Sequence, residues 1–345
     1  MQDVYQQLDE WRRANTTLAI TTVVETWGSA PRPVGSKMIV TQSGGIAGSV
    51  SAGCVEGAVI EESQHVMQTG IPRLVEFGVA DDTAWSVGLA CGGKIKVFIE
   101  PGKAYDSIYD ALKENLENGK PFLTLTYLNG PDEYINKKVL IEPGGKQIGE
   151  LNFVGRENQF VQVALSYLDK EEGATIKVND HSTLFVDVQP VPPKLIVVGA
   201  VHLAIPLIQI ASILGFETFL VDPRQAFATR ERFPDVGKLI LKWPDEALQE
   251  IGLDKSTYVV VLTHDPKLDD PALLFALNSG ASYIGALGSR RTNQKRIDRL
   301  IKAGMTNTQI SRLHAPIGLD LGGRSSDEIA ISIMAEIVQV RNQGE

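Results

Sequence analysis

The sequence predicts an α/β protein with an N-terminal α+β domain followed by a C-terminal Rossmann-like domain, a doubly wound parallel sheet. The 345 residues suffice for two hydrophobic cores. From residue 195 onward, short apolar strands alternate with helices, the pattern of a parallel sheet covered on both faces. Residues 189–194 hold three prolines in six positions, which favours a stiff connector. We therefore expect domains at residues 1–188 and 195–345, joined by the linker 189–194.

The N-terminal domain should begin with a helix, because Val4, Leu8 and Trp11 recur at helical spacing. From residue 121 onward the sequence has the pattern of short strands and turns. We interpret this part as a β-rich extension of the same domain. No internal repeat is evident. Strands are expected at 18–26, 36–40, 73–77, 94–99, 122–127, 139–142, 175–178 and 183–188, with helices at 55–68 and 105–118.

The C-terminal domain should alternate strictly, and right-handed crossovers would join its parallel strands. A last helix is expected from residue 326, because residues 325–328 (SSDE) form a capping-box pattern. Strands are expected at 195–198, 217–221, 238–241, 258–262 and 283–286, with helices at 203–214, 245–251, 268–278, 291–303 and 326–340.

Composition excludes several classes of protein. The 33 basic and 42 acidic residues give a net charge of -9, which argues against nucleic-acid binding and against binding to an anionic membrane. No run of apolar residues resembles a signal peptide or a membrane span, so we expect a cytoplasmic location. The chain holds only two cysteines, which is no disulfide framework.

The turn after the first C-terminal strand resembles a dinucleotide fingerprint with one defect. Gly199 and Ala204 fit the G-x-G-x-x-G/A pattern, and Asp222 follows at the expected distance. Val201 stands where the second glycine would let the backbone approach a pyrophosphate. NAD(P) binding in the usual pose is therefore disfavoured. The alternative reading is that Gly199 only makes a tight turn and Ala204 only packs the helix.

Other polar residues follow the predicted strands, where open α/β sheets bind their ligands. We take His202, Asp222, Arg224, Asp265 and Arg290 as candidate binding residues. An arginine at a helix N-terminus can hold phosphate or carboxylate. His202 and His264 can equally be ordinary loop histidines. Further along that helix, we expect Lys295, Arg296 and Arg299 to form a solvated basic face.

The two cysteines lie in glycine-rich backbone, which permits tight turns and close approach of a ligand. Gly53 precedes Cys54, and Gly92 follows Cys91. Cys54 would stand at the start of a helix, where the helix dipole lowers the pKa of a thiol. Two thiols are too few for a closed zinc site, and no Cys-x-x-Cys spacing exists. The alternative is that both are buried or weakly exposed thiols without a functional role.

The loop 28–37 (GSAPRPVGSK) can complete the same pocket, with Arg32 and Lys37 as partners for an anion. Its alternative reading is a rigid turn.

These motifs together resemble the XdhC/CoxI family, the accessory proteins for maturation of xanthine dehydrogenase and related molybdenum hydroxylases. The likeness covers nearly the whole chain. It rests on GSAPRPVGSKM, GSVSAGCVEGAV, GLACGGKIKVFIEP, GAVHLA, VDPRQAFATRERFP, LTHDPKLD, YIGALGSRRT and HAPIGLDLGGRSSDEIAISIMAEI. Family members often carry Gly-x-Gly at the turn where this chain has Val201.

The resemblance implies a protein that binds the molybdenum cofactor (molybdopterin), assists its sulfuration and inserts it into an apo hydroxylase of the xanthine dehydrogenase type. A cysteine desulfurase would be a second partner. Cys54 and Cys91 match the family's glycine-flanked cysteines and would contact the cofactor and its metal. Gly199, His202, Asp222, Arg224, Asp265 and Arg290 also match family positions. A soft metal with a phosphate tail suits thiols at one end and an anion seat at the other.

Two rival functions remain open from the residues alone. The Rossmann-like pattern with Asp222 is also that of an NAD(P)-dependent oxidoreductase, and a nucleotide-binding regulator without catalysis is a third possibility. A homodimer is expected on general grounds, since symmetric dimers are common and the apolar helix ending near Val340 can supply an interface.

Overall fold

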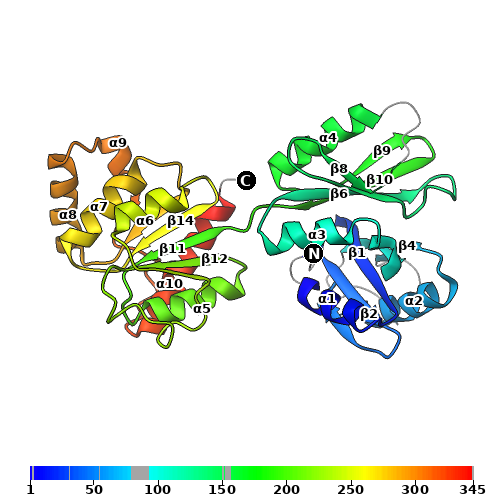
Figure 1. The fold of residues 1–345 in the computed structure, drawn as a ribbon, viewed down its shortest axis with the longest axis horizontal. Coiled ribbons are helices and arrows are strands. Elements are labelled where there is room, and N and C mark those ends of the chain that lie inside the picture. The colour runs from blue at the N-terminus through cyan, green and yellow to red at the C-terminus, as the bar shows by residue number, and fades with distance from the viewer. Residues whose placement is uncertain are drawn as a thin grey trace. The chain divides into compact units, whose positions relative to one another are not determined.

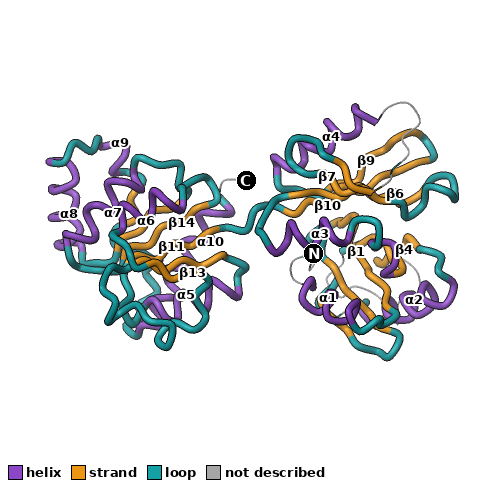
Figure 2. Tube along the Cα trace, viewed as in Figure 1, coloured by secondary structure: helices purple, strands orange, loops and turns teal. Residues whose placement is uncertain are grey.

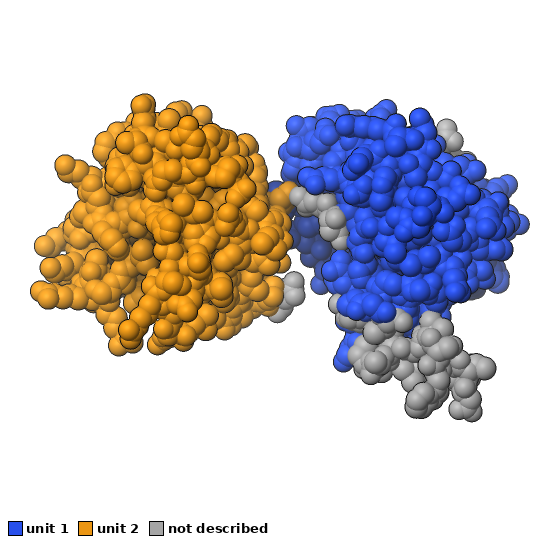
Figure 3. Space-filling model, turned by 90° about the horizontal axis from the view of Figure 1, so that it is seen from below, with its two compact units in different colours: residues 1–191 blue, residues 192–345 orange. Residues whose placement is uncertain are grey.

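The computed structural model describes residues 1, 4–30, 32–53, 55–78, 93–149, 151 and 157–343, with only the backbone at 157–159. The chain divides into two compact units, Met1–Val191 and Pro192–Glu345 (Figure 3). The boundary between them falls within the proline-rich segment 189–194. No helix in the described part of the chain is long and apolar enough to cross a membrane.

The first half of unit 1 is a five-stranded antiparallel sheet with one helix before it and one helix inserted. The strand order is β3-β2-β1-β5-β4. The elements are α1 (Tyr5–Arg13), β1 (Leu18–Trp27), β2 (Lys37–Thr41), β3 (Ile46–Gly48), α2 (Glu56–Thr69), β4 (Arg73–Gly78) and β5 (Lys94–Pro101).

The second half of unit 1 repeats this arrangement. Its strand order, β8-β7-β6-β10-β9, is the same order shifted by five strands. Figure 2 shows strands β6, β7, β9 and β10 of this half together with helix α4. After a short 3-10 helix η3 (Gly102–Tyr105), the elements are α3 (Tyr109–Glu117), β6 (Phe122–Asn129), β7 (Lys138–Ile141), β8 (Gln147–Gly149), α4 (Glu157–Lys170), β9 (Ala174–Asn179) and β10 (Ser182–Gln189). Each half thus runs helix, three strands, helix, two strands.

Unit 1 therefore contains the same topology twice, and we name residues 5–101 repeat 1 and residues 109–189 repeat 2. No repeat was expected from the sequence, whereas the structure shows one in the topology. The β-rich extension expected after residue 121 supplies the strands of repeat 2, but its helix α4 was not expected. Corresponding turns share left-handed backbone. Gly48 and Gly149, which end β3 and β8, have φ values of 74° and 97°. A Cβ on either glycine would meet the carbonyl oxygen at the start of the neighbouring strand, that of Lys37 or Lys138.

Two buried ion pairs join the repeats and correspond to each other. Lys37 begins β2 and its Nζ lies 2.7 Å from Asp187 of β10, while Lys138 begins β7 and its Nζ lies 2.5 Å from Glu100 of β5. Each lysine therefore pairs with an acid of the other repeat, and all four side chains are almost completely buried. Thr22 also accepts a hydrogen bond from Lys37, at 3.0 Å.

Apolar side chains complete the contact between the repeats. One cluster combines Val24 and Phe98 of repeat 1 with Leu128 and Phe185 of repeat 2. The opposite face of each sheet is covered by its own helix, α2 in repeat 1 and α4 in repeat 2. This alternation follows from the period of two along a strand.

Unit 2 is a six-stranded, wholly parallel sheet in the order β13-β12-β11-β14-β15-β16 (Figure 1). The strands are β11 (Lys194–Val198), β12 (Glu217–Val221), β13 (Lys238–Ile240), β14 (Thr257–Val261), β15 (Tyr283–Ala286) and β16 (Leu313–His314). The helices are α5 (Ala204–Ile213), α6 (Pro244–Ile251), α7 (Pro266–Leu277), α8 (Arg290–Lys302), α9 (Asn307–Ile310) and α10 (Ser326–Asn342). The predicted doubly wound, Rossmann-like domain is confirmed.

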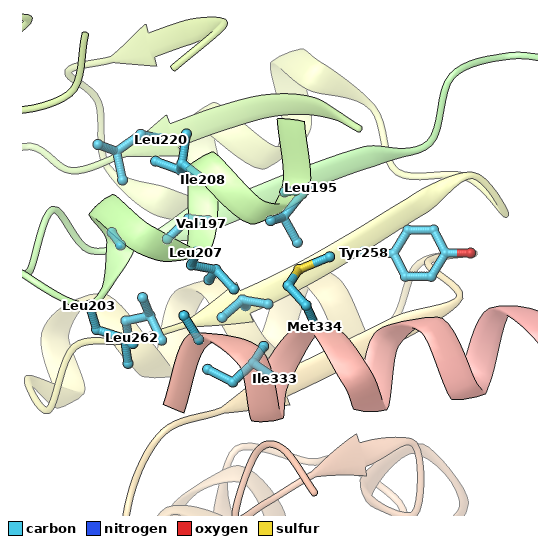
Figure 4. Packing of buried hydrophobic residues seen from close by; sticks show 14 of the residues in the cluster. Leu195, Val197, Leu203, Leu207, Ile208, Leu220, Tyr258, Leu262, Ile333 and Met334 are labelled. Atoms are coloured by element: carbon cyan, nitrogen blue, oxygen red, sulfur yellow. The ribbon is translucent and has the colours of Figure 1, made fainter. Parts of the chain in front are cut away.

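Both faces of this sheet are covered. Leu195 and Val197 pack against α5 and α10, as Figure 4 shows with Leu207, Ile333 and Met334. The intervening strand residues face α6, α7 and α8. Residues alternate between two apolar faces, which is why these strands are hydrophobic throughout.

Candidate functional site

The first candidate site is the cysteine-bearing part of repeat 1. Cys54, Cys91 and Gly92 lie outside the described residues. The segment that precedes Cys54, residues 49–53, is described and leaves β3 for helix α2. Within it, Ala52 and Gly53 both adopt left-handed backbone, with φ values of 59° and 112°.

The carboxylate of Glu56, the first residue of α2, accepts several hydrogen bonds from this segment. Oε1 accepts hydrogen bonds from the Ser49 hydroxyl at 2.7 Å and from the Ser51 backbone N–H at 2.9 Å. Oε2 accepts from the Gly53 N–H at 2.8 Å and from the Ser51 hydroxyl. Burial opposes ionisation, but these hydrogen bonds outweigh it and lower the pKa of Glu56 to about 2. Sequence reasoning missed Glu56, because a glutamate at a helix start usually only complements the dipole.

The two basic residues of the loop before β2 have different roles. The Arg32 Nε–H donates to the carbonyl oxygen of Ser49 at 3.3 Å, so this side chain reaches the cysteine segment. Lys37 is fully buried and its anionic partner is Asp187. The expectation that Lys37 binds a ligand anion was therefore wrong, since its charge is already compensated inside the protein.

Repeat 2 carries no counterpart of either cysteine. Cys54 stands two residues before the first residue of α2, and Gly155 stands two residues before the first residue of α4. Cys91 belongs to the long connection from β4 to β5, whereas β9 and β10 are joined through Asp180 and His181 alone. The thiols are thus confined to repeat 1.

In unit 2, the altered fingerprint forms a turn that packs closely on Thr263, just beyond the neighbouring strand β14. Gly199 has a φ of 112°, and a Cβ there would lie 2.4 Å from Cγ2 of Thr263. Val201 is partly buried and packs against the core, while His202 is exposed. Gly199 is therefore required by the turn itself, whether or not a ligand binds.

The carboxylate of Asp222 already accepts hydrogen bonds from protein groups. Its Oδ2 accepts from the Ala200 N–H at 2.8 Å and from Arg224 NH2 at 2.7 Å, and its Oδ1 accepts from the Nε and backbone N–H of Arg224, both at 2.9 Å. Burial opposes ionisation, but these bonds hold the pKa of Asp222 below its usual range. The residue is 1% exposed, so it is not presented to a ribose hydroxyl. Asp265 caps α7 by accepting from the Lys267 N–H at 3.0 Å.

A pocket of about 660 Å³ lies at the carboxyl ends of β14 and β15. Its wall combines His264 with Ser289 and Arg290 at the start of α8, where Ser289 caps the helix. The pocket thus includes Arg290 and His264 but none of Gly199, His202, Asp222, Arg224 and Asp265. The remaining lining residues are Leu287, Gly288, Pro316, Ile317, Gly318, Leu319, Asp320, Leu321, Gly322, Gly323, Glu328, Ile329 and Ser332.

A buried polar group supports one wall of this pocket. Arg296 is 1% exposed, pairs with Asp269 at 2.7 Å and donates to the Leu287 carbonyl at 3.1 Å. Burial raises the pKa of Asp269, in spite of hydrogen bonds from Thr263 and Arg296. Arg299 forms two hydrogen bonds to Asp270. The expected solvated basic face was wrong for Arg296, which holds the segment before Arg290 in place.

Glu336 of α10 supports the opposite wall. Its Oε2 accepts from the Gly318 N–H at 2.7 Å and from the Tyr283 hydroxyl at 2.5 Å, and its Oε1 lies 3.1 Å from Nδ1 of His314. Although burial opposes ionisation, these partners lower the pKa of Glu336. No sequence pattern pointed to this group, because its members are distant in the chain.

No cluster of three or more metal-binding side chains occurs among the residues that the structure describes. Cys54 and Cys91 lie outside those residues, so their contact with a metal stays a prediction.

Comparison with known proteins finds family models that match parts of both units. The family model described as XdhC Rossmann domain matches residues 195–337, and the one described as XdhC and CoxI family matches residues 11–78. The fold and these matches define a protein of the XdhC type. The chain belongs to the XdhC and CoxI family.

Relatives extend over the whole chain. The chain is 27% identical to a probable xanthine dehydrogenase subunit of Bacillus subtilis, with 99% of both proteins covered. It is 26% identical to the molybdenum cofactor insertion chaperone PaoD of Escherichia coli, over 93% of this chain and 83% of that protein. A crystal structure described as a xanthine dehydrogenase from Bacillus halodurans matches with a TM-score of 0.80 and 26% identity, covering 100% of this chain and 97% of the other.

Proposed function

We propose that this protein is an accessory protein that binds the molybdenum cofactor and inserts it into an apo hydroxylase of the xanthine dehydrogenase type. Its membership of the XdhC and CoxI family and its similarity to PaoD, a molybdenum cofactor insertion chaperone, support this role. The observation that carries the proposal in the structure is the restriction of both thiols to repeat 1, where the segment before Cys54 is tightly held.

In this proposal, Cys54 and Cys91 contact the molybdenum centre of the cargo, since thiolates are preferred ligands of soft metals. Gly53 and Gly92 leave room for the cargo beside the thiols. Arg32 braces the cysteine segment through Ser49 and adds positive charge nearby.

Unit 2 would take an anionic part of the cargo. Arg290 and His264 line its pocket together with the N-terminus of α8, a combination that favours phosphate at that end of the pocket, whereas Asp320 and Glu328 in the same lining oppose an anion beside them. Gly199, Asp222, Arg224 and Asp265 would shape the neighbouring strand ends, and exposed His202 would be free to contact a ligand. Sulfuration with a cysteine desulfurase, a homodimeric state and a cytoplasmic location complete the proposal.

Purification from cells that make molybdopterin tests the proposal. Bound molybdenum, and pterin fluorescence after oxidation, should exceed background in the wild-type protein and fall to background in the Cys54→Ala/Cys91→Ala variant. Absence of both signals from the wild type would refute cofactor binding. Equal signals in the variant would refute the role of the thiols.

An NAD(P)-dependent oxidoreductase is the rival function, and the parallel sheet of unit 2 is the observation that favours it. Against it, Asp222 is buried and its carboxylate is already bound to Ala200 and Arg224. Val201 also fills the position where the backbone would approach the pyrophosphate.

A further inference from the structure

A groove lies where the two repeats of unit 1 meet. It consists of two adjoining pockets of about 730 Å³ and 350 Å³, whose walls share Gly70, Pro101, Lys103 and Asp106. We name these two pockets together the junction groove. Repeat 1, the connection after β5 and the start of β7 in repeat 2 all contribute to its wall, so neither repeat forms it alone. The volume of the larger pocket suits a small-molecule ligand.

Two ammonium groups in the wall of the larger pocket carry uncompensated charge. Lys103 and Lys137 are exposed, and neither forms an ion pair or a side-chain hydrogen bond with any residue that the structure describes. The other charges in this wall are compensated. Asp106 is bound by Arg12 at 2.6 Å, and the ammonium group of Lys138 is bound by Glu100.

The carboxyl end of α2 offsets only part of this charge. Gly70 caps that end, and a Cβ on Gly70 would lie 3.7 Å from Nζ of Lys103. A helix end carries about half a negative charge, so two ammonium groups leave the groove with more than one positive charge. This local excess contrasts with the net charge of -9 of the whole chain, and it favours an anionic ligand.

Polar groups beside the lysines suit a ligand that also carries hydroxyl groups. Asn136 lies in the wall next to Lys137, in left-handed backbone with a φ of 69°. Its Oδ1 is buried and has no hydrogen-bond partner among the described residues, and a buried acceptor without a partner is unfavourable. Ser107 of the larger pocket and Thr17 of the smaller one add exposed hydroxyls.

We propose that the junction groove binds a small phosphate monoester with hydroxyl groups, of the sugar phosphate class: Lys103 and Lys137 hold the phosphate, and Asn136 accepts a hydrogen bond from a ligand hydroxyl. A phosphate monoester carries nearly two negative charges at neutral pH, which matches the two ammonium groups.

This site goes beyond the proposed function. Among the residues that line the groove, none belongs to the segment 49–53 or to unit 2. The segment 49–53 adjoins the first turn of α2, whereas the groove adjoins the last turn, about 20 Å further along the helix. The groove is therefore separate from the site proposed around the thiols.

Isothermal titration calorimetry tests this inference with the full chain, purified from cells that make no molybdopterin. The probes are ribose 5-phosphate, inorganic phosphate and ribose. Ribose 5-phosphate should bind with a Kd below about 1 mM and more tightly than inorganic phosphate, whereas ribose alone should not bind. The Kd for ribose 5-phosphate should rise with salt concentration, because salt screens the attraction between the phosphate and the exposed ammonium groups.

Lys103→Gln and Lys137→Gln should each raise the Kd for ribose 5-phosphate about three- to tenfold, because each removes one of the charges that hold the phosphate. The control is Lys177→Gln, since Lys177 is exposed on β9, also lacks an ion pair among the described residues, and lies outside the groove. This variant should bind like the wild type. Asn136→Gly keeps a residue that tolerates positive φ, and it should weaken the binding of ribose 5-phosphate but not that of inorganic phosphate.

No binding of ribose 5-phosphate at about 10 mM would overturn the inference, and so would an unchanged Kd in Lys103→Gln/Lys137→Gln. Equal Kd values for ribose 5-phosphate and inorganic phosphate would also overturn it, because the groove would then hold free phosphate and not an ester. Equal binding by Asn136→Gly and the wild type would refute the part assigned to Asn136. None of these measurements needs the molybdenum cofactor, so they decide the role of the groove whether the proposed function holds or fails.

Discussion

Removal of one lysine from the contact between the repeats should destabilise unit 1 severely. In Lys37→Met, the carboxylate of Asp187 loses its partner at 2.7 Å while its side chain stays only 6% exposed. Among the residues that the structure describes, its Oδ1 has no hydrogen-bond partner even in the parent protein. An uncompensated buried charge of this kind costs about 3–5 kcal/mol of unfolding free energy. Lys37→Met/Asp187→Leu removes both charges and should recover most of this loss.

Urea unfolding followed by tryptophan fluorescence measures the effect. The background is Trp243→Phe, so that every remaining tryptophan lies within residues 1–191. With a slope of about 2 kcal/mol/M, Lys37→Met should lower the midpoint by about 1.5–2.5 M. The control is Lys94→Met, which removes a half-exposed pair with Glu76 and should cost less than about 1 kcal/mol. A loss below about 1 kcal/mol in Lys37→Met, or an equal loss in the double variant, would refute the reasoning.

Three further predictions concern unit 2. Gly199→Ala should cost about 2 kcal/mol or more in thermal unfolding, because its Cβ would meet Thr263 and its φ is positive; an unchanged midpoint would contradict the packing described. The pKa of Glu336 is lowered in the folded state, so the stability that this carboxylate contributes should be lost as the pH falls from about 4.3 through the folded pKa. Glu336→Gln should therefore flatten that part of the acid unfolding curve, and a curve as steep as that of the parent protein would contradict this role of Glu336. Calorimetry should detect no NAD(P) binding at millimolar cofactor, because the Asp222 carboxylate is occupied; a Kd below about 1 mM would overturn that view.

The C-terminal fold could be predicted from the sequence because its strands carry two apolar faces. Residues 195–198 were expected as a strand and form most of β11, and the turn glycine Gly199 follows directly. In unit 1, helix α4 was missed. Its first half, with Phe160, Val161 and Val163, is aromatic or β-branched and has low helix propensity, although Ala164, Leu165 and Leu168 in its second half favour a helix.

The repeated topology left only a weak sequence signal, because Lys37 and Lys138 correspond, as do Gly48 and Gly149, but many other corresponding positions carry different residues. Gly35 before β2 corresponds to Asn136 before β7, and both adopt positive φ, which either residue type tolerates. Glu100 corresponds to Asp187, and each pairs with a lysine of the other repeat. Such relations depend on which strands face each other, and that information exists only in the folded protein.

The hydrogen-bond partners of the polar groups around the sites also could not be predicted from the sequence. Arg296 has the sequence context of a surface helix, yet it is buried because Asp269, on the adjacent helix α7, compensates its charge. Glu56 accepts from residues 49–53 only because the chain turns sharply there. In both cases, the residue types could be read from the sequence but their partners could not.

Transfer of the cofactor to its client tests the central claim most directly. The protein, purified with its bound molybdenum cofactor, is mixed with an apo hydroxylase of the xanthine dehydrogenase type, and the hydroxylase activity gained per molybdenum is measured. The wild type should activate the hydroxylase in proportion to the cofactor supplied, and the Cys54→Ala/Cys91→Ala variant should not. No gain with loaded wild type, or an equal gain with the variant, would contradict the claim that the thiols of repeat 1 carry the cofactor to the enzyme.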